Sequence, residues 1–215
     1  MYPIDFIDQL KLNLTQALPG SKAHSKMLPT GRSLTQTPPS DARISGVMIL
    51  LYELDKQWNT ILIRRTEDGL PHSGQISFPG GKKEPSDPDL SFTACRECEE
   101  EIGVPIPDIE LVGTLSTLYI PPSNFLVTPS VGYIKTLQNF KASEREVQEI
   151  IQLPLDLLFD HRIKKERIVV PSSSPMQQIK TPVYELGEDL IVWGATAMII
   201  AELESIIETI RQTKS

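Results

Sequence analysis

The order of apolar and polar positions divides the chain into short strands and a few helices. Residues 46–54 and 60–65 are apolar, β-rich runs on either side of a polar turn at 55–57, so they predict a hairpin of buried strands. A short strand is expected at 76–78. The same reasoning places further strands at 108–118, 125–134, 168–170, 183–186 and 190–193.

Helical periodicity appears near both ends of the chain and in the middle. Residues 4–17 predict an amphipathic helix that ends at Pro19-Gly20, and residues 195–211 predict a helix that covers the sheet. Residues 144–151 and 154–159 are also expected to be helical. Strands interrupted by one central helix and closed by a C-terminal one indicate an α/β fold with a sheet packed between helices.

The segment after the first helix differs in composition. Residues 21–43 are rich in Ser, Thr, Pro and Lys and show little periodicity, which predicts an extended arm. This arm wraps the domain, helps to build a homodimer or is a mobile leader, and Met27-Leu28-Pro29 is an apolar group that can tuck into a groove. We expect a helical arm at 1–44 and one domain at 45–215.

The most informative stretch is residues 78–104, in which a glycine pair is followed by a turn of prolines and acids and then by the central helix. Either Asp89 or Ser91 is expected to cap the N-terminus of this helix, and Gly103 is expected to end it. The helix is therefore predicted at 90–102.

Three carboxylates share one face of that helix, at Glu97, Glu100 and Glu101. Like charges at these spacings destabilise a helix by roughly 0.2–0.5 kcal/mol per pair. A bound cation would remove this repulsion, and oxygen ligands suit Mg²⁺ or Mn²⁺ rather than zinc. The alternative is a solvated acidic face.

Two neighbouring features favour the cation. Arg96 is adjacent to Glu97 and four residues before Glu100, so it can orient both carboxylates. Gly80 and Gly81 can bring bare backbone groups close to a metal or a phosphate, because they have no Cβ.

The charge balance excludes some classes of partner. A net charge of −7 and a pI near 5.1 give no general attraction to nucleic acid or to an anionic membrane, so we expect a small-molecule substrate and a cytoplasmic enzyme. The longest apolar stretch, 190–201, is shorter than the ~20 residues of a membrane span, and residues 1–18 lack the pattern of an export signal. Cys95 and Cys98 have no second ligand pair and are expected to fill the core.

These residues resemble the Nudix box, in which Gly, five residues, Glu and seven residues precede Arg-Glu, an apolar residue, any residue, Glu-Glu, any residue, Gly and an apolar residue. Its second half is matched without a gap by Arg96, Glu97, Cys98, Glu100, Glu101, Gly103 and Val104. In the first half, Asp87 replaces the Glu and eight residues separate it from Arg96. That insertion and the segment HSGQISFPGG at 72–81 are similar to the coenzyme A pyrophosphatase branch of the family.

The resemblance implies a Nudix-type α/β/α sandwich with a mixed sheet. It also implies a divalent-metal-dependent hydrolase of a nucleoside diphosphate-linked substrate, here coenzyme A or a derivative, cut to 3′,5′-ADP and 4′-phosphopantetheine. The alternatives are a hydrolase of another nucleotide conjugate such as ADP-ribose, or a non-catalytic nucleotide-binding domain. An arm that forms a protein interaction surface is compatible with each of them.

The resemblance also assigns the site residues. The metal ligands are expected to be Glu97, Glu100, Glu101 and the carbonyl of Gly80 or Gly81. The catalytic residues are expected to be Arg96, Glu97, Glu100 and Glu149. The carboxylate that takes a proton from water is expected to be Glu97 or one of the two more distant acids, Glu146 and Glu149. Substrate-binding residues are expected to be Arg65, His72, Gly74, Gly80 and Gly81, while Leu70 stands where the branch usually has a basic residue. Asp87 either holds the loop through Arg96 or a backbone N–H, or caps the helix.

Overall fold

The computed structural model describes the chain apart from residues 1, 3–4, 67–72, 137–138, 172–175 and 214–215. The strands are β1 (Arg43–Leu54), β2 (Gln57–Arg65), β3 (Ile76–Ser77), β4 (Gly80–Lys82), β5 (Glu110–Thr114), β6 (Leu118–Ile120), β7 (Phe125–Tyr133), β8 (Val147–Pro154), β9 (Lys164–Val169), β10 (Ile179–Glu185) and β11 (Ile191–Val192). The α-helices are α1 (Phe6–Leu14), α2 (Ser21–His24), α3 (Leu90–Ile102) and α4 (Gly194–Gln212). Short 3₁₀ helices lie at Ser25–Met27, Ile106–Asp108, Pro121–Ser123, Leu155–Phe159 and His161–Ile163.

The main sheet is built around the predicted hairpin of β1 and β2. The two strands pair antiparallel across a turn in which Asp55 and Lys56 both have positive φ, the backbone geometry of a tight hairpin turn that follows the twist of the strands. On its other side β1 pairs with β7 in parallel, so the sheet is mixed. The strand order is β3-β2-β1-β7-β5, with β4 against β1, β6 against β7 and β8 against β2.

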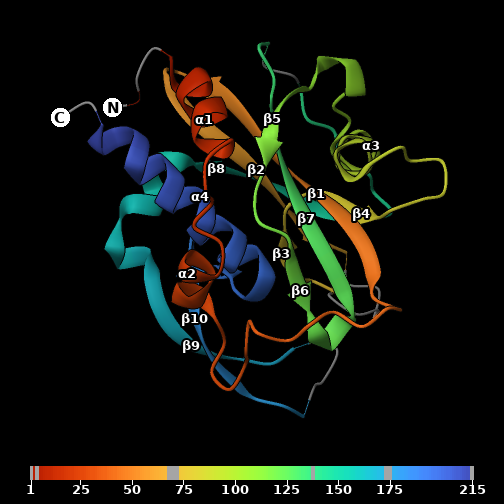
Figure 1. The fold of residues 1–215 in the computed structure, drawn as a ribbon, viewed down its shortest axis with the longest axis vertical. Coiled ribbons are helices and arrows are strands. Elements are labelled where there is room, and N and C mark those ends of the chain that lie inside the picture. Colours follow the sequence, from red (N-terminus) through yellow and green to blue (C-terminus); the bar gives the residue numbers. More distant parts are fainter. Residues whose placement is uncertain (1, 3–4, 67–72, 137–138, 172–175, 214–215) are drawn as a thin grey trace.

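Helices cover both faces of this sheet, as Figure 1 shows for α3 on one side and α1 and α4 on the other. Because side chains alternate along a strand, Met48 and Leu50 of β1 lie in one core with Cys98 of α3. Ile49 lies in the other core, together with Ile200 of α4. The predicted α/β/α sandwich with a mixed sheet is therefore confirmed.

The N-terminal segment packs onto the sandwich as two helices. Phe6 and Leu10 of α1 are fully buried in the core that contains α4. The expectation of an extended conformation is wrong for residues 21–27, which form α2 and a 3₁₀ turn and bury His24 and Met27. Four helical residues are too few to show periodicity, so α2 could not be predicted from the apolar pattern. The segment wraps the domain, which was one of the sequence-based alternatives.

The predicted helix at 144–151 is wrong, because β8 occupies Val147–Pro154 and pairs antiparallel with β2. Val147, Ile151 and Leu153 are buried along it. The spacing of its apolar residues fits a helix as well as a strand, and the neighbouring strand decided between them.

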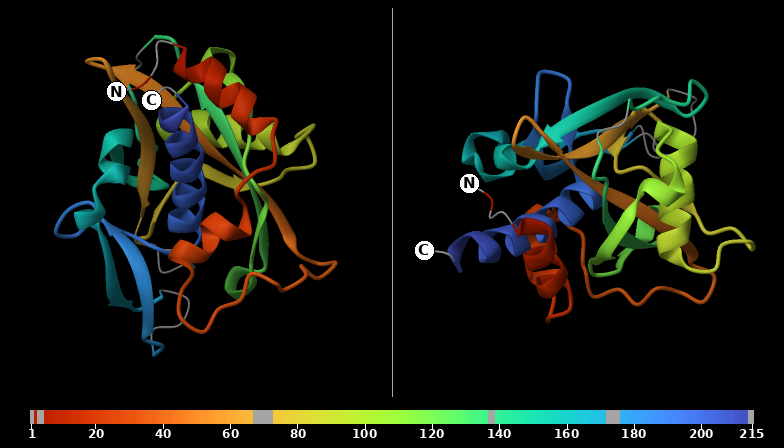
Figure 2. Two further views of the ribbon diagram at one scale, coloured as in Figure 1. Left: turned by 60° about the vertical axis from the view of Figure 1, so that its left-hand side comes forward. Right: turned by 90° about the horizontal axis from the view of Figure 1, so that it is seen from above.

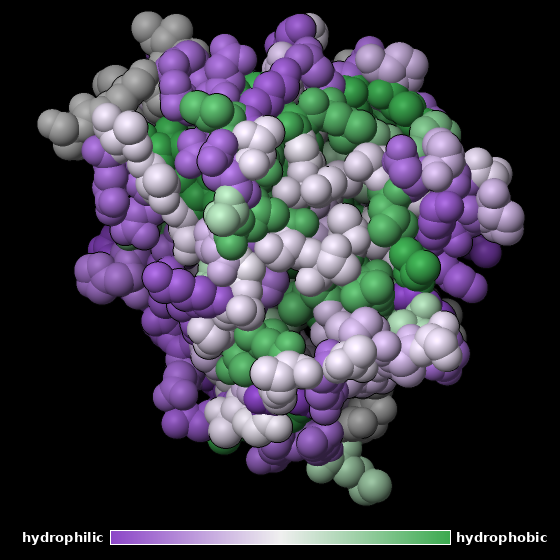
Figure 3. Space-filling view, viewed as in Figure 1, coloured by the Kyte–Doolittle hydropathy of each residue, from purple (hydrophilic) through white to green (hydrophobic). Residues whose placement is uncertain are grey.

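A second, three-stranded sheet follows in the order β11-β10-β9. Figure 2 shows its β9–β10 hairpin reaching away from the main sheet, below α4 in the left-hand view. Among the described residues, no helix combines the length and apolar character needed to cross a membrane. Figure 3 shows apolar residues interspersed with hydrophilic ones over the face of Figure 1.

Candidate functional site

The carboxylates of the site are carried by α3, whose two ends are fixed locally. The Asp89 side chain accepts a hydrogen bond from the Phe92 N–H at 2.8 Å, so Asp89 rather than Ser91 is the N-cap. Gly103 takes the left-handed conformation that ends a helix, with φ of 74°. The helix bounds are those predicted, and its C-terminal half presents Glu97, Glu100 and Glu101.

The glycine loop lies so close to α3 and to β1 that side chains would not fit. A Cβ on Gly81 would lie 2.3 Å from Oε1 of Glu97, and one on Gly80 would lie 2.5 Å from the carbonyl oxygen of Gly46. The Gly80 N–H donates to Oε2 of Glu101 at 2.9 Å. The loop therefore contacts two of the three carboxylates.

Arg96 holds the acidic side chains in place. Its Nε and Nη2 donate to the two carboxylate oxygens of Asp87, each at 3.0 Å. Its Nη1 donates to Glu97 at 2.9 Å and to Glu100 at 3.0 Å. One guanidinium thus ties the turn before α3 to two acids of the helix, which is the orienting role expected from the sequence.

Asp87 completes this network and is itself buried. Its Oδ2 also accepts from the Glu84 N–H and the Thr93 hydroxyl, both at 2.9 Å. The hydrogen bonds from Arg96 hold the pKa of Asp87 far below its usual value. Asp87 therefore fixes the loop through Arg96 and a backbone N–H, whereas the helix cap is Asp89.

Glu101 and Glu97 lie in an environment that disfavours their charge. Glu101 is 1% exposed, and burial, with a further contribution from Glu97 and Glu146, raises its pKa to about 8. The pKa of Glu97 is also raised, first by burial and then by Glu100 and Glu146, against the opposing effect of Arg96. The pKa of each acid is therefore raised despite the opposing effect of Arg96 on Glu97 and of Arg65 on Glu101.

The two arginines at the end of β2 have different partners. Arg65 donates to Oε1 of Glu101 at 3.2 Å and is one-third exposed. Arg64 instead pairs with Glu149 of β8 at 3.1 Å. Of the two distant acids considered from the sequence, Glu146 is the one whose charge acts on Glu97 and Glu101, while Glu149 is paired with an arginine.

The remaining predicted residues are placed as follows. Gly74 has a positive φ and its N–H bonds the Thr66 carbonyl oxygen at 3.4 Å, so it shapes the turn beside Arg65. His72 and Leu70 lie outside the described residues. Sequence reasoning missed Gly46, whose Cβ would lie 2.3 Å from the Leu90 carbonyl oxygen; a glycine inside an apolar strand was the available signal of a close approach.

The donor set fits a hard divalent cation in its chemistry. Glu97 and Glu101 offer carboxylate oxygens next to the backbone of Gly80 and Gly81, which carries no side chains. Glu100 is half-exposed. In the described part of the chain, however, no three acidic, histidine or cysteine side chains converge on one point, since Glu97 and Glu100 are turned towards Arg96. A cation would have to draw at least one of them away from Arg96.

The two cysteines play no part in this arrangement. Both are buried in the core between α3 and the sheet, as the sequence predicted. Burial raises the pKa of Cys95 to about 11 and raises that of Cys98 further, so both thiols stay protonated and unreactive at neutral pH.

Comparison with known proteins agrees with this geometry. A family model described as the NUDIX domain matches residues 42–169. A protein of Photorhabdus laumondii described as an uncharacterized Nudix hydrolase NudL is 32% identical over 178 residues, covering 80% of this chain and 92% of the relative. A relative of the same description from Yersinia enterocolitica is 41% identical over 148 residues, covering 67% and 72%.

Among solved structures, a MutT/nudix family protein from Enterococcus faecalis aligns with a TM-score of 0.50 at 17% identity, covering 94% of this chain and 74% of that one. This likeness supports the fold. Together with the matched domain and the relatives, it shows that the chain belongs to the Nudix hydrolase family.

Proposed function

We propose that this Nudix hydrolase cleaves the diphosphate of coenzyme A or its derivatives with the help of Mg²⁺ or Mn²⁺. The coarser activity follows from the family: it is an enzyme that acts on nucleoside diphosphate-linked substrates. The observation that carries the metal is the pair of carboxylates, Glu97 and Glu101, that lie against the glycine loop.

The proposed ligands are Glu97, Glu100, Glu101 and the carbonyl of Gly80. Bound there, a divalent cation supplies charge neutralisation on the diphosphate oxygens and lowers the pKa of water. The chain's own residues do the positioning. Asp87 holds Arg96 and Arg96 holds Glu97 and Glu100, so the acids are fixed before substrate arrives. Because Gly81 has no Cβ, there is room for the Glu97 carboxylate to lie against the loop.

Proton transfer is assigned to Glu146. It lies on the segment before β8, and its charge acts on both buried acids of α3, whereas Glu149 is engaged by Arg64. A general base must lie close to the water that it deprotonates, and Glu146 is the acid outside α3 that acts on both buried glutamates. Glu149 is retained as the alternative from the sequence.

The preference for coenzyme A rests on the sequence similarity of 72–81 and on the residue inserted after Asp87. Arg65 is proposed to bind a substrate phosphate, because its guanidinium reaches Glu101 and remains one-third exposed. His72 and Gly74 complete the proposed substrate-binding set. Leu70, in place of a basic residue, favours testing conjugates that lack the 3′-phosphate as well.

The test is product analysis by mass spectrometry on a panel of coenzyme A, acetyl-CoA, dephospho-CoA, ADP-ribose and diadenosine polyphosphates. Each substrate is incubated with Mg²⁺, with Mn²⁺ and with a chelator. We expect 3′,5′-ADP and 4′-phosphopantetheine from coenzyme A, with the highest kcat/KM of the panel. Faster turnover of ADP-ribose than of coenzyme A would overturn the substrate assignment.

A further inference from the structure

A β-bulge interrupts β8 close to the two candidate proton acceptors. In the pairing of β2 with β8, Arg64 is opposite Glu149. The next residue, Arg65, is opposite Val147, so Gln148 is an extra residue in β8. A bulge of this kind bends the strand and re-aims its side chains, and bulges are over-represented next to active sites.

The bulge changes the face of the main sheet to which β8 contributes. Ile151 and Leu153 lie in the core with α4, as expected for residues two apart on one strand. By the same alternation Glu149 lies on the α4 side, and Val147 would follow it, but Val147 lies in the core with α3. The chain before Gln148 is therefore brought to the side of the sheet that carries the acids of α3.

The segment that leads to Glu146 is attached to the C-terminal end of α3. The Ser143 N–H donates to the Glu101 carbonyl oxygen at 2.9 Å. The Ser143 carbonyl oxygen in turn accepts from the Glu146 N–H at 3.0 Å. Carbonyl groups in the last turn of a helix have no partner within the helix, so the segment uses one that α3 leaves free. This attachment keeps Glu146 near α3, where its charge acts on Glu97 and Glu101.

Thr66 holds the same segment from the other side. It follows the last residue of β2, and its N–H donates to the Glu146 carbonyl oxygen at 3.2 Å. Its hydroxyl donates to the Arg145 carbonyl oxygen, also at 3.2 Å. These two carbonyl groups belong to the planar peptide units on either side of the Glu146 Cα. Thr66 therefore fixes the direction in which the Glu146 side chain leaves the backbone.

Thr66 is also joined to the proposed substrate-binding residues. Its carbonyl oxygen accepts from the Gly74 N–H at 3.4 Å. The residue before it, Arg65, donates its N–H to the Gln75 carbonyl oxygen at 3.1 Å and its guanidinium to Glu101. One residue thus lies between the segment of Glu146 and the residues proposed to bind substrate.

We propose that Thr66 is a positioning residue for Glu146, whose carboxylate it directs towards the acids of α3 by binding the Arg145 carbonyl oxygen. The proposal rests on the role of Glu146 as proton acceptor under the proposed function. Thr66 acts through the backbone of Glu146 and not on the reacting atoms. A small displacement of a catalytic group lowers the rate, so the loss of one of the two hydrogen bonds from Thr66 should be seen in kcat.

The first test is steady-state kinetics of Thr66→Val, which removes the hydroxyl but keeps the backbone N–H and the shape of the side chain. The substrate is the member of the panel that the wild type cleaves fastest. We expect kcat to fall about fivefold with KM within about twofold, because the proton acceptor is displaced while substrate contacts remain. Thr66→Ser keeps a hydroxyl and should restore kcat. An unchanged kcat in Thr66→Val would overturn the proposal.

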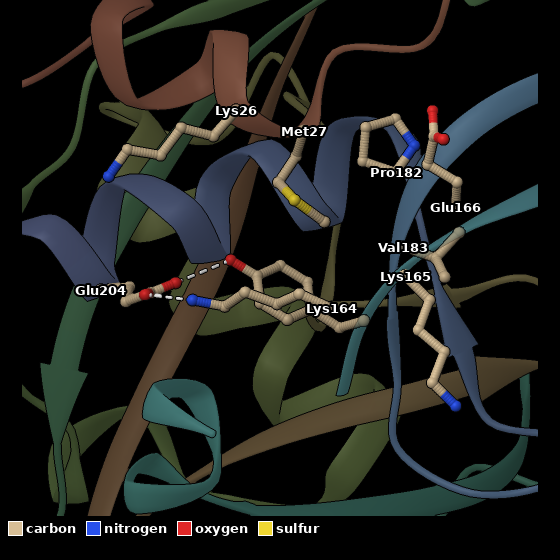
Figure 4. Close-up of a pocket in the computed structure, with 9 residues that line it drawn as sticks. Lys26, Met27, Lys164, Lys165, Glu166, Pro182, Val183 and Glu204 are labelled. Carbon is tan, nitrogen blue, oxygen red and sulfur yellow. Dashed lines mark hydrogen bonds and ion pairs between the residues drawn. The ribbon is translucent and has the colours of Figure 1, made fainter. Parts of the chain in front are cut away.

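The control is Tyr184→Phe, which removes a hydroxyl on the α4 side of the molecule. The Tyr184 hydroxyl donates to Glu204 at 2.9 Å in the pocket that Figure 4 shows, where Lys164 also pairs with Glu204. This variant should lower the midpoint of urea denaturation and leave kcat unchanged. A fall in kcat equal to that of Thr66→Val would show that kcat follows stability, and would overturn the proposal.

A double variant distinguishes failure of this proposal from failure of the proposed function. If Thr66 acts only through Glu146, adding Thr66→Val to Glu146→Gln should lower kcat by less than about twofold more. A second full fall would overturn the positioning role and leave the assignment of Glu146 intact. Full kcat in Glu146→Gln alone would instead show that the proton acceptor is wrongly assigned, and the role of Thr66 would fall with it.

Discussion

Two buried glutamates show how differently this protein treats the same side chain. Glu101 of α3 and Glu202 of α4 are 1% and 0% exposed. Glu202 accepts hydrogen bonds from the Gly20 N–H and the Ser116 hydroxyl and pairs with His24 at 2.8 Å. These donors lower its pKa despite its burial.

Glu101 has two donors, Gly80 and Arg65, but it also faces Glu97 and Glu146, and its pKa rises to about 8. Glu202 therefore joins the N-terminal segment, the β5–β6 connection and α4, and its partners in the chain are enough to stabilise its charge. For Glu101, the effects of Gly80 and Arg65 are outweighed by burial and by the neighbouring acids. The comparison separates a carboxylate that serves structure from one that we propose as a metal ligand.

The largest expected effect comes from removing a charge at the site. Glu97→Gln should lower kcat/KM by about 10³-fold, because the amide is a poor ligand for a hard cation, while stability changes little. Glu99→Gln on the same helix is the matched control, since Glu99 is exposed and its amide can still accept from the Ile106 N–H. Activity that survives in Glu97→Gln would remove Glu97 from the catalytic set.

Substitution of Glu202 should instead lower stability and leave activity unchanged. Glu202→Ala leaves the His24 ring and the Ser116 donors buried without a partner, so we expect the free energy of unfolding to fall by about 3–5 kcal/mol. Urea denaturation measures this loss. The fraction that remains folded should keep its kcat, and a loss below about 1 kcal/mol would show that Glu202 does not secure the N-terminal segment.

The pH dependence of stability should distinguish the two glutamates. The pKa of Glu101 in the folded state lies above its unfolded value of 4.5, so the folded protein binds more protons between about pH 4.5 and 8. Stability of the metal-free protein should therefore fall as pH rises through this window, by an amount on the order of a few kcal/mol. Glu101→Gln should flatten the profile there, and an unchanged profile would contradict the raised pKa.

The smallest expected effect on kcat distinguishes Glu146 from Glu149. Glu146→Gln should lower kcat by about 10- to 100-fold with little change in stability, because it removes the proposed proton acceptor. Glu149→Gln breaks a partly exposed pair with Arg64 and should leave kcat within about twofold. The reverse outcome would restore Glu149 as the general base.

Much of the site could be predicted because its elements carry local signals. The bounds of α3 follow from a capping aspartate and a terminal glycine, and the acidic face follows from the spacing of its glutamates. The β1–β2 hairpin was also predicted, from two apolar runs on either side of a polar turn. The cap itself, Asp89 rather than Ser91, and the role of Asp87 as the partner of Arg96 required the structure.

Contacts between distant segments could not be predicted from the sequence. The conformation of β8 was decided by its pairing with β2, and the burial of His24 by Glu202, which lies 178 residues away. Apolar periodicity describes one segment at a time, so it cannot reveal which partner a segment meets. The sequence likewise could not show that Glu146 acts on Glu97 and Glu101 while Glu149 pairs with Arg64, because these residues come from different segments.

The most direct test of the central claim is calorimetric titration of Mn²⁺ into chelator-treated protein, compared among wild type, Glu97→Gln and Glu202→Gln. We expect saturable binding to wild type that is lost in Glu97→Gln and retained in folded Glu202→Gln. Equal binding to wild type and Glu97→Gln, or no binding to wild type, would contradict it.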